Sequence, residues 1–116
     1  MMEFRTRSPD DWLEAGKMYM DKHYANGITI YELASYLNVH RSYLSKKFTE
    51  HYQLSPKQYL HQLKMKRAAE LLCKSSMSVT EIAHSLQYSD SFVFSRAYKN
   101  YHRCAPSYTR QQALAK

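Results

Sequence analysis

The chain has 116 residues, of which 44% are hydrophobic, and its formal net charge at pH 7 is +7. This length suits one domain or two very small ones, and the apolar content is enough to bury a core, so the chain is not compositionally disordered. Two glycines and three prolines are few for the length, which favours helices with short connections over a β-sandwich. The basic charge predicts a polyanionic partner, either nucleic acid or an acidic membrane surface.

The sequence contains no apolar run long enough to span a membrane and no apolar core of a signal peptide. We therefore expect a cytoplasmic protein. Cys73 and Cys104 are too few for a disulfide framework and lack CxxC spacing, so we expect neither disulfides nor a zinc site. We interpret both cysteines as small core residues.

The first predicted helix begins at a proline. Ser8 is the expected N-cap, Pro9 is the first helical residue, and acidic residues follow in the first turn. The pair Asn26-Gly27 ends the helix. Helical spacing predicts a packing face made of Trp12, Ala15, Tyr19 and His23.

Three further helix starts carry a capping box, in which a hydroxyl residue is followed three positions later by Glu or Gln. They stand at residues 29–32 (TIYE), 55–58 (SPKQ) and 78–81 (SVTE). Pro106 predicts the start of a short last helix.

The boxes at 29–32 and 78–81 open two copies of one pattern, 49 positions apart. Beyond the following turn the offset is 50, as between Pro56 and Pro106. We therefore expect one inserted residue in the second copy, near Val93. Two copies are too few for a solenoid and indicate a pair of matched modules.

Each copy has the anatomy of a helix-turn-helix. A short capped helix comes first, then a few turn residues, then a second helix rich in Ser, Lys and Arg. In DNA-binding domains of this kind the second helix lies in the major groove. Ala34 and Ala83 stand where the second helix crosses the first, and their small side chains allow a close approach.

The segment between the copies has no Pro or Gly after Pro56 and is rich in helix-forming residues. Its apolar residues spread around the helix, as expected of a helix that touches two partners. We predict a stiff helix of roughly 17 residues, about 25 Å long, within the range 55–74. It would join a first subdomain at 8–54 to a second at 75–113, so that both second helices meet one face of a duplex, about 34 Å apart.

The order of elements resembles the DNA-binding domain of the AraC/XylS family of bacterial transcription regulators. The resemblance rests on residues 32–48 (ELASYLNVHRSYLSKKF), 55–72 (SPKQYLHQLKMKRAAELL) and 78–101 (SVTEIAHSLQYSDSFVFSRAYKNY), with Pro106 and Arg110. It implies an all-α domain of seven helices, with two helix-turn-helix subdomains joined by a long central helix. Such a domain would bind an asymmetric site as a bidentate monomer, through two consecutive major grooves.

The resemblance also implies a function and a set of partners. The expected partner is double-stranded DNA, with RNA polymerase as a second candidate, and we expect no cofactor and no membrane partner. The domain is expected to be a monomer. It is either a fragment from the C-terminal end of a longer regulator with a sensing domain, for which a dimer is one option, or a stand-alone member of the family. The family leans to activation, and control of carbon-source genes is the expectation that follows.

The sequence departs from the family at three turns. Gln53 and Arg103 stand where a glycine commonly follows each second helix, and Gln87 stands where a glycine commonly precedes an aromatic residue. Glycine at such positions serves a left-handed backbone. A non-glycine residue costs roughly 1–2 kcal/mol there, so either these turns differ from the family or the chain tolerates the strain.

Exposed positions early in the two second helices are the candidates for reading bases. Lys46 and Arg96 lead, because Lys and Arg side chains reach guanine O6 and N7, while Phe92 or Val93 can touch a thymine methyl group. Arg41 suits either a base or a phosphate. The resemblance matches Ser42, Ser45 and Lys46 to positions that reach base edges. The full set is Arg41, Ser42, Ser45, Lys46, Ser91, Phe92, Ser95 and Arg96.

The other residues of interest divide into core and phosphate contacts. Phosphate contacts set the register of a protein on DNA rather than its sequence preference. The candidates for them are Thr29, Lys47, Ser78, Lys99, Asn100 and Arg103, although Thr29 and Ser78 serve first as caps. Core spacing falls on Tyr43, Leu44, Phe48, Phe94 and Tyr98, with Tyr43 shared between core and surface.

Two other classes of function fit the same sequence. A helical adaptor would bind an acidic protein through an apolar groove, and an RNA-binding domain would prefer structured RNA to duplex DNA. A single Lys or Ser on a helix is usually solvated surface, so the DNA interpretation depends on two sets of residues at matching offsets. The six histidines form no metal-binding pair around a helical Glu, and we do not expect an enzyme.

Overall fold

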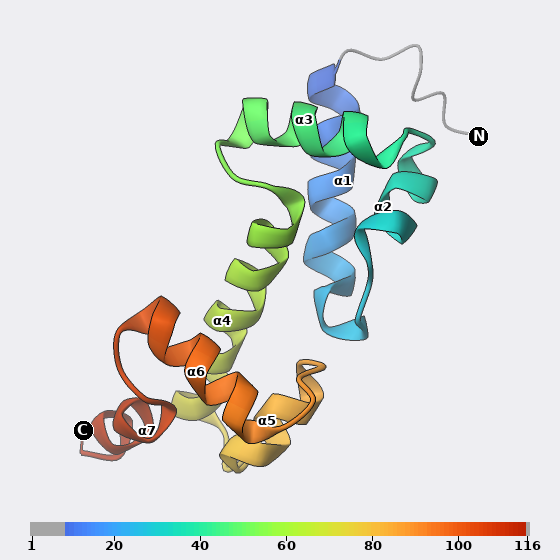
Figure 1. The fold of residues 1–116 in the computed structure, drawn as a ribbon. Coiled ribbons are helices and arrows are strands. Elements are labelled where there is room, and N and C mark those ends of the chain that lie inside the picture. Colours follow the sequence, from blue (N-terminus) through green and yellow to red (C-terminus); the bar gives the residue numbers. More distant parts are fainter. Residues whose placement is uncertain (1–8, 116) are drawn as a thin grey trace. The chain divides into compact units, whose positions relative to one another are not determined.

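The computed structural model describes residues 9–115, with side chains from Trp12 onward. In this range the chain forms seven α-helices and one 3₁₀ turn, and no strand (Figure 1). The predicted all-α class with seven helices is confirmed, while Ser8, the predicted first N-cap, lies outside the described residues. The helices are α1 (Pro9–His23), α2 (Ile30–Leu37), α3 (Arg41–Tyr52), α4 (Pro56–Lys74), α5 (Val79–Ser85), α6 (Ser91–His102) and α7 (Pro106–Leu114), and the 3₁₀ turn is Tyr24–Asn26.

Two compact units divide the chain between His61 and Gln62, inside α4. The first unit holds α1, α2, α3 and the start of α4, and the second holds the rest of α4 with α5, α6 and α7. α4 is one α-helix of 19 residues, slightly longer than predicted. Its side chains enter both cores, because Leu60 is buried in the first unit while Met65, Ala68 and Leu72 are buried in the second.

The face through which α1 packs differs from the predicted one. Trp12 is buried as expected, but the other buried positions are shifted by one residue, to Leu13, Gly16 and Met20. Gly16 explains the shift, because a Cβ atom there would lie 2.8 Å from Leu37 Cδ1. α1 therefore passes α2 at a distance that only a glycine allows without a rearrangement of Leu37. The partly exposed residues are Ala15, Tyr19 and His23.

A hydrogen bond joins α4 to α1 within the first unit. The Tyr59 hydroxyl group donates a hydrogen bond to Asp21 Oδ1 at 2.5 Å. Burial, and then the bond to Asp21, raise the pKa of the Tyr59 hydroxyl. The Lys17 ammonium lies over the same ring, 5.8 Å from its centroid. These contacts hold the start of α4 against α1.

In the second unit, α6 is fixed to both α7 and α4 by side-chain hydrogen bonds. The Tyr98 hydroxyl lies 2.8 Å from Thr109 Oγ1 on α7. His102 Nε2 lies 2.9 Å from the carbonyl oxygen of Met65 on α4, so this nitrogen is the donor. The orientation of α6 therefore depends on hydrogen bonds as well as on its buried apolar side chains.

All three capping boxes form as predicted. The Glu32 N–H donates to Thr29 Oγ1 at 3.1 Å, and the Thr29 N–H donates to Glu32 Oε1 at 2.8 Å. The same pairs of bonds join Ser55 to Gln58 and Ser78 to Glu81. Each box satisfies N–H groups that a helix start leaves unpaired, so local sequence determines where α2, α4 and α5 begin.

The three turns that lack the family's glycine keep the left-handed backbone. Gln53, Gln87 and Arg103 have φ angles of 66°, 70° and 67°. Asn38 is a fourth such residue, with a φ of 58°, and asparagine tolerates this region better than most side chains do. The chain therefore accepts the backbone strain at these positions rather than changing the turns.

The inserted residue of the second copy lies before α6, and the predicted place near Val93 is wrong. The left-handed residues Asn38 and Gln87 keep the offset of 49. The N-caps His40 and Asp90 are already 50 positions apart. The extra residue therefore lies in the turn that ends at Asp90, and α3 and α6 can be compared residue by residue at an offset of 50.

Candidate nucleic-acid interface

α3 and α6 begin with side-chain caps of different chemistry. At α3, His40 Nδ1 accepts a hydrogen bond from the Ser42 N–H at 3.1 Å. At α6, Asp90 Oδ1 accepts one from the Val93 N–H at 2.9 Å. A histidine can cap in this way only while Nδ1 carries no proton, which places the proton of the neutral ring on Nε2.

The two helices bury equivalent residues. Leu44 and Phe48 are buried on α3, and Phe94 and Tyr98 are buried on α6, so these four predicted core residues are confirmed. Because the buried positions recur every four residues, the opposite side of each helix faces solvent.

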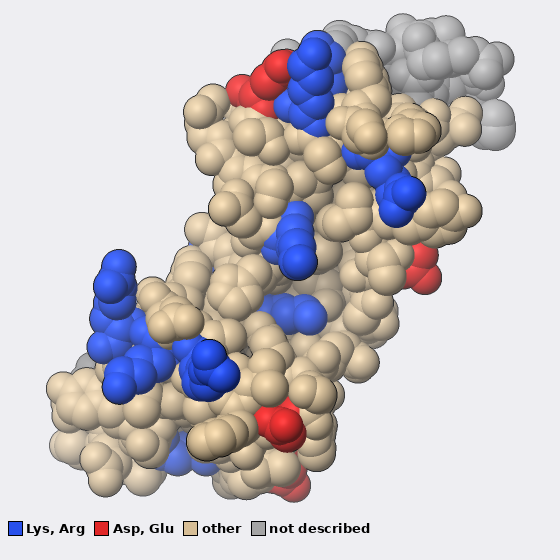
Figure 2. Space-filling view, viewed as in Figure 1, with Lys and Arg blue, Asp and Glu red and all other residues tan. Residues whose placement is uncertain are grey.

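The predicted base-reading residues lie on the solvent side of their helices. On α3, Arg41, Ser42 and Lys46 are exposed, and Ser45 is half-buried. On α6, Phe92 and Arg96 are exposed, and Ser91 and Ser95 are half-buried. Positions three and four residues apart lie on the same side of a helix, so α3 presents Ser42, Ser45 and Lys46 together, and α6 presents Phe92, Ser95 and Arg96 together. Figure 2 shows basic side chains over α3 and over α6.

Tyr43 is a surface residue more than a core residue. Its side chain is 45% exposed, in line with the prediction that it is shared between core and surface. Its ring stacks on Trp12 of α1 at a centroid distance of 5.7 Å. The Lys47 ammonium lies 5.8 Å from the centroid of the same ring.

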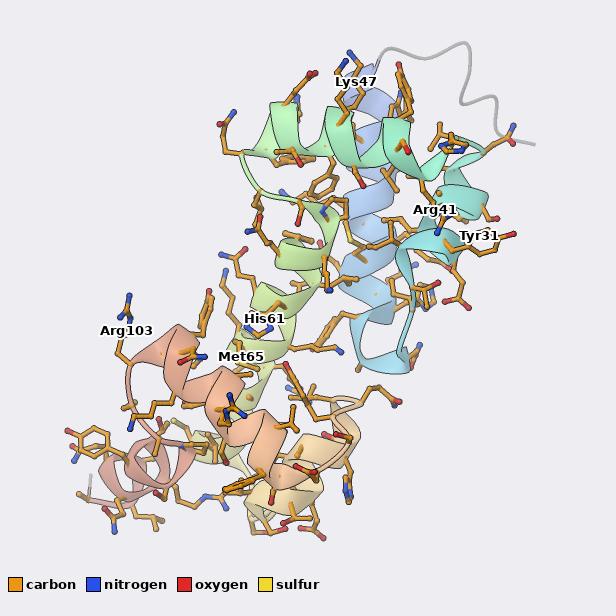
Figure 3. The ribbon with its side chains drawn as sticks, in the orientation of Figure 1. Tyr31, Arg41, Lys47, His61, Met65 and Arg103 are labelled. Carbon is orange, nitrogen blue, oxygen red and sulfur yellow. The ribbon has the colours of Figure 1, made fainter. Side chains whose placement is uncertain are left out.

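The predicted phosphate contacts differ in whether their side chains already take part in other contacts within the domain. Thr29 and Ser78 use their hydroxyl groups as caps. Lys47 Nζ lies 3.6 Å from the Glu50 carboxylate, and Figure 3 shows this lysine at the outer side of α3. Lys99, Asn100 and Arg103 are exposed at the end of α6, and Figure 3 shows Arg103 directed away from the helix.

Sequence reasoning missed Tyr31 of α2. Its side chain is 65% exposed, and Arg41 Cζ lies 5.7 Å from the centroid of its ring (Figure 3). No periodicity links these two residues, because the pairing depends on the path of the turn between α2 and α3. Tyr31 therefore joins the candidate interface only once the fold is known.

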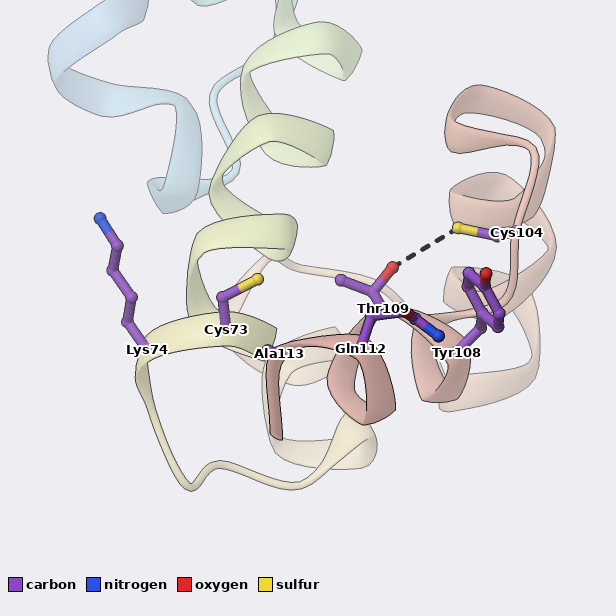
Figure 4. A pocket seen from close by; sticks show the side chains of 7 residues that line it. All are labelled: Cys73, Lys74, Cys104, Tyr108, Thr109, Gln112 and Ala113. Carbon is purple, nitrogen blue, oxygen red and sulfur yellow. Dashed lines mark hydrogen bonds between the residues drawn. The ribbon is translucent and has the colours of Figure 1, made fainter. Parts of the chain in front are cut away.

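Both cysteines line a pocket of about 490 Å³ in the second unit (Figure 4). Cys73 is exposed and Cys104 is partly exposed, so their assignment as core residues is wrong. Cys104 Sγ lies 3.5 Å from Thr109 Oγ1. The other lining residues are Lys74, Tyr108, Gln112 and Ala113.

The described residues contain no group of three or more His, Cys, Asp or Glu side chains that could hold a metal ion. None of the helices in residues 9–115 is both long and apolar enough to cross a membrane.

Comparison with known proteins assigns the chain to a family. Residues 33–112 match the model of a helix-turn-helix domain. The raffinose operon transcriptional regulatory protein RafR of Pediococcus pentosaceus is 42% identical over 93 residues, which cover 80% of this chain and 34% of RafR. The Msm operon regulatory protein of Streptococcus mutans is 35% identical over 111 residues, which cover 96% of this chain and 40% of that protein. The chain thus spans less than half the length of these relatives.

A solved structure agrees with these relatives. A transcriptional regulator of Chromobacterium violaceum, described as an AraC-type DNA-binding domain-containing protein, matches with a TM-score of 0.84 and 25% identity, over 90% of this chain and 93% of that one. Fold, sequence match and element order agree, and the predicted resemblance is confirmed. The chain belongs to the AraC-type family of helix-turn-helix DNA-binding domains of transcription regulators.

Proposed function

We propose that this domain reads a specific duplex DNA sequence with α3 and α6, each placed in a major groove. The observation that carries the proposal is the equivalence of Lys46 and Arg96. They stand 50 positions apart, both are exposed, and each lies two positions before a buried aromatic residue. Two basic side chains at equivalent positions on equivalent helices are better explained by contacts of both helices with DNA than by a role as ordinary solvated surface residues.

The proposed roles follow the chemistry of each side chain. Lys46 and Arg96 reach guanine acceptors, and Phe92 touches a thymine methyl group. The supporting base contacts are Ser42, Ser45, Ser91 and Ser95. The proposed phosphate contacts are Thr29, Lys47, Ser78, Lys99, Asn100 and Arg103.

We propose that the two helices use consecutive major grooves of one duplex. The subdomains at 8–54 and 75–113 would each supply one recognition helix, and α4, a continuous helix that supplies buried residues to both units, supports this mode. The domain would then bind as a monomer.

The proposed biological role is control of a sugar operon within a longer regulator. It rests on the relative RafR, which is named as a regulator of the raffinose operon. We propose activation, with RNA polymerase as the second partner of the longer protein, and a cytoplasmic location beside the chromosome. A promoter transcription assay with the full-length regulator tests this part separately.

Selection of sites from random duplexes, followed by binding measurements, tests the DNA-reading proposal. Arg96→Ala should weaken binding to the selected duplex by about 1–3 kcal/mol and relax the preference at one base pair. Arg67→Ala is the matched control, because Arg67 is an exposed arginine on α4 paired with Glu70, and it should leave base preference intact. An equal loss on selected and random duplexes would reassign Arg96 to phosphate.

The rival classes give different results in the same experiment. A preference for structured RNA over duplex DNA at equal salt would favour an RNA-binding domain. Binding to an acidic protein that duplex DNA does not compete away would favour an adaptor. The DNA proposal predicts affinity that falls steeply as salt rises, because bound phosphates release counterions.

A further inference from the structure

We infer that Tyr31 is a positioning residue that holds Arg41 for a DNA phosphate beside the first recognition helix. This inference rests on the proposed function, since it assumes that α3 lies against duplex DNA. Sequence spacing allowed Arg41 to serve a base or a phosphate. The position of its guanidinium in the structure favours the phosphate.

The geometry places the Arg41 side chain toward α2. Arg41 is the first residue of α3, and its Cζ atom lies 5.7 Å from the centroid of the Tyr31 ring, in the first turn of α2 (Figure 3). The base-reading candidates Ser42, Ser45 and Lys46 stand on α3 itself. A guanidinium drawn to the neighbouring helix lies at the flank of the recognition helix, where the backbone of a bound duplex runs.

The neighbouring groups at this flank also suit a phosphate. Thr29, the N-cap of α2, stands two residues before Tyr31, and the N-terminal N–H groups of a helix favour an anion. Glu32 is engaged in the Thr29 capping box. Within the described residues, no Asp or Glu side chain forms an ion pair with Arg41.

Contact with an aromatic ring orients an arginine side chain so that it can bind a phosphate. A guanidinium that rests its face on an aromatic ring keeps its in-plane N–H groups available for two parallel hydrogen bonds. The ring also limits the rotamers of a flexible side chain, so less freedom is lost when the phosphate binds. Tyr31 would therefore strengthen binding without touching DNA.

The pair of Tyr31 and Arg41 has no equivalent in the second unit. The position equivalent to Tyr31 in the second copy, 49 residues later, is Thr80, and the position equivalent to Arg41, 50 residues later, is Ser91. Neither an aromatic ring nor a guanidinium is present there. The two recognition helices thus differ in how they are anchored, although their cores match.

The test measures binding to a duplex selected with the wild-type domain and to a random duplex, each over a series of salt concentrations. Arg41→Ala should lower the slope of log affinity against log salt by about 0.9 on both duplexes and leave base preference unchanged. Tyr31→Ala should keep the slope, because the charge remains, and should weaken both complexes about two- to fivefold. Tyr31→Phe should bind as the wild type does, since it keeps the ring.

A double variant and a control separate positioning from a general structural effect. In the Arg41→Ala background, Tyr31→Ala should have no further effect on binding. Tyr108→Ala, at a 53% exposed tyrosine of α7, should behave as the wild type. Thermal unfolding of each variant checks that the fold is kept.

Two outcomes would overturn the inference. Tyr31→Ala could weaken binding equally with and without Arg41, which would make the two residues independent. Arg41→Ala could relax preference at one base pair with the salt slope unchanged, which would make Arg41 a base reader. Failure of the proposed function is a different result, in which the wild-type domain shows no salt-dependent binding to duplex DNA at all.

Discussion

Arg110 of α7 donates a hydrogen bond from Nε to the carbonyl oxygen of Leu72, in the last turn of α4, at 3.2 Å. Its other nitrogens donate to the carbonyl oxygens of Leu71, Ser75 and Met77. The last four carbonyl groups of a helix have no hydrogen-bond donor within the helix. Here an arginine from another helix acts as a donor to two of them, those of Leu71 and Leu72. Because Met77 precedes the N-cap of α5, the same side chain also places the start of the second helix-turn-helix.

Loss of this arginine should destabilise the second unit. Arg110→Ala leaves several partly buried carbonyl groups without a donor, and it should lower the free energy of unfolding by about 2–4 kcal/mol. Arg110→Lys should be intermediate, because an ammonium cannot reach all four carbonyl groups. Denaturant unfolding measures both, with Arg67→Ala as the exposed control, for which a change of at most about 0.5 kcal/mol is expected. Equal values for Arg110→Ala and Arg67→Ala would contradict the role of this contact.

Substitutions of Arg103 should affect both the stability of the domain and its binding to DNA. Its φ of 67° is strained for any residue with a Cβ atom, so Arg103→Gly should be about 1 kcal/mol more stable than Arg103→Ala. Both variants remove one charge, and both should lower the salt slope of DNA binding by about 0.9 if Arg103 binds a phosphate. Chemical unfolding and salt titration separate the two effects. Identical stabilities for the Gly and Ala variants would show that the turn is unstrained.

The cap at the start of α3 should be replaceable by ordinary capping residues. His40→Ala removes the acceptor for the Ser42 N–H and should cost about 1 kcal/mol of unfolding free energy. His40→Asn should restore it, because asparagine is among the best N-caps. His84→Ala, at an exposed histidine of α5, is the control. If His40→Asn is as unstable as His40→Ala, the histidine contributes through something other than its cap.

The two cysteines should differ in reactivity. Cys73 is exposed at the end of α4, whereas Cys104 is only partly exposed. A brief treatment of the folded domain with a maleimide should therefore label Cys73 first, since access as well as thiolate character governs the rate. Mass spectrometry of peptides after quenching measures the order. Equal labelling in denaturant is the control, and faster labelling of Cys104 in the folded domain would contradict the structure.

Features that depend on neighbouring residues in the sequence were predictable. Each capping box is closed by two residues three positions apart, so the starts of α2, α4 and α5 followed from local chemistry. The buried pairs Leu44 with Phe48 and Phe94 with Tyr98 followed from helical spacing. The repeat then identified equivalent exposed positions on α3 and α6, so the amino-acid pattern alone was enough to propose the candidate interface.

Features that depend on how helices meet were not predictable. The packing face of α1 is set by the close approach of Gly16 to Leu37, and no pattern within α1 indicates that contact. The inserted residue lies in a turn, where sequence similarity is too low to place it. Cys73 is exposed because it lies beyond the buried side of α4, and Tyr31 meets Arg41 only through the path of the turn between their helices.

The most direct test of two recognition helices is base preference measured by selection with three proteins, the wild-type domain, Lys46→Ala and Arg96→Ala. If α3 and α6 occupy consecutive major grooves, each variant relaxes preference at a different base pair, and the two base pairs lie about 10–10.5 bp apart. Full preference in either variant, or relaxation of the same base pair by both, would contradict the double contact.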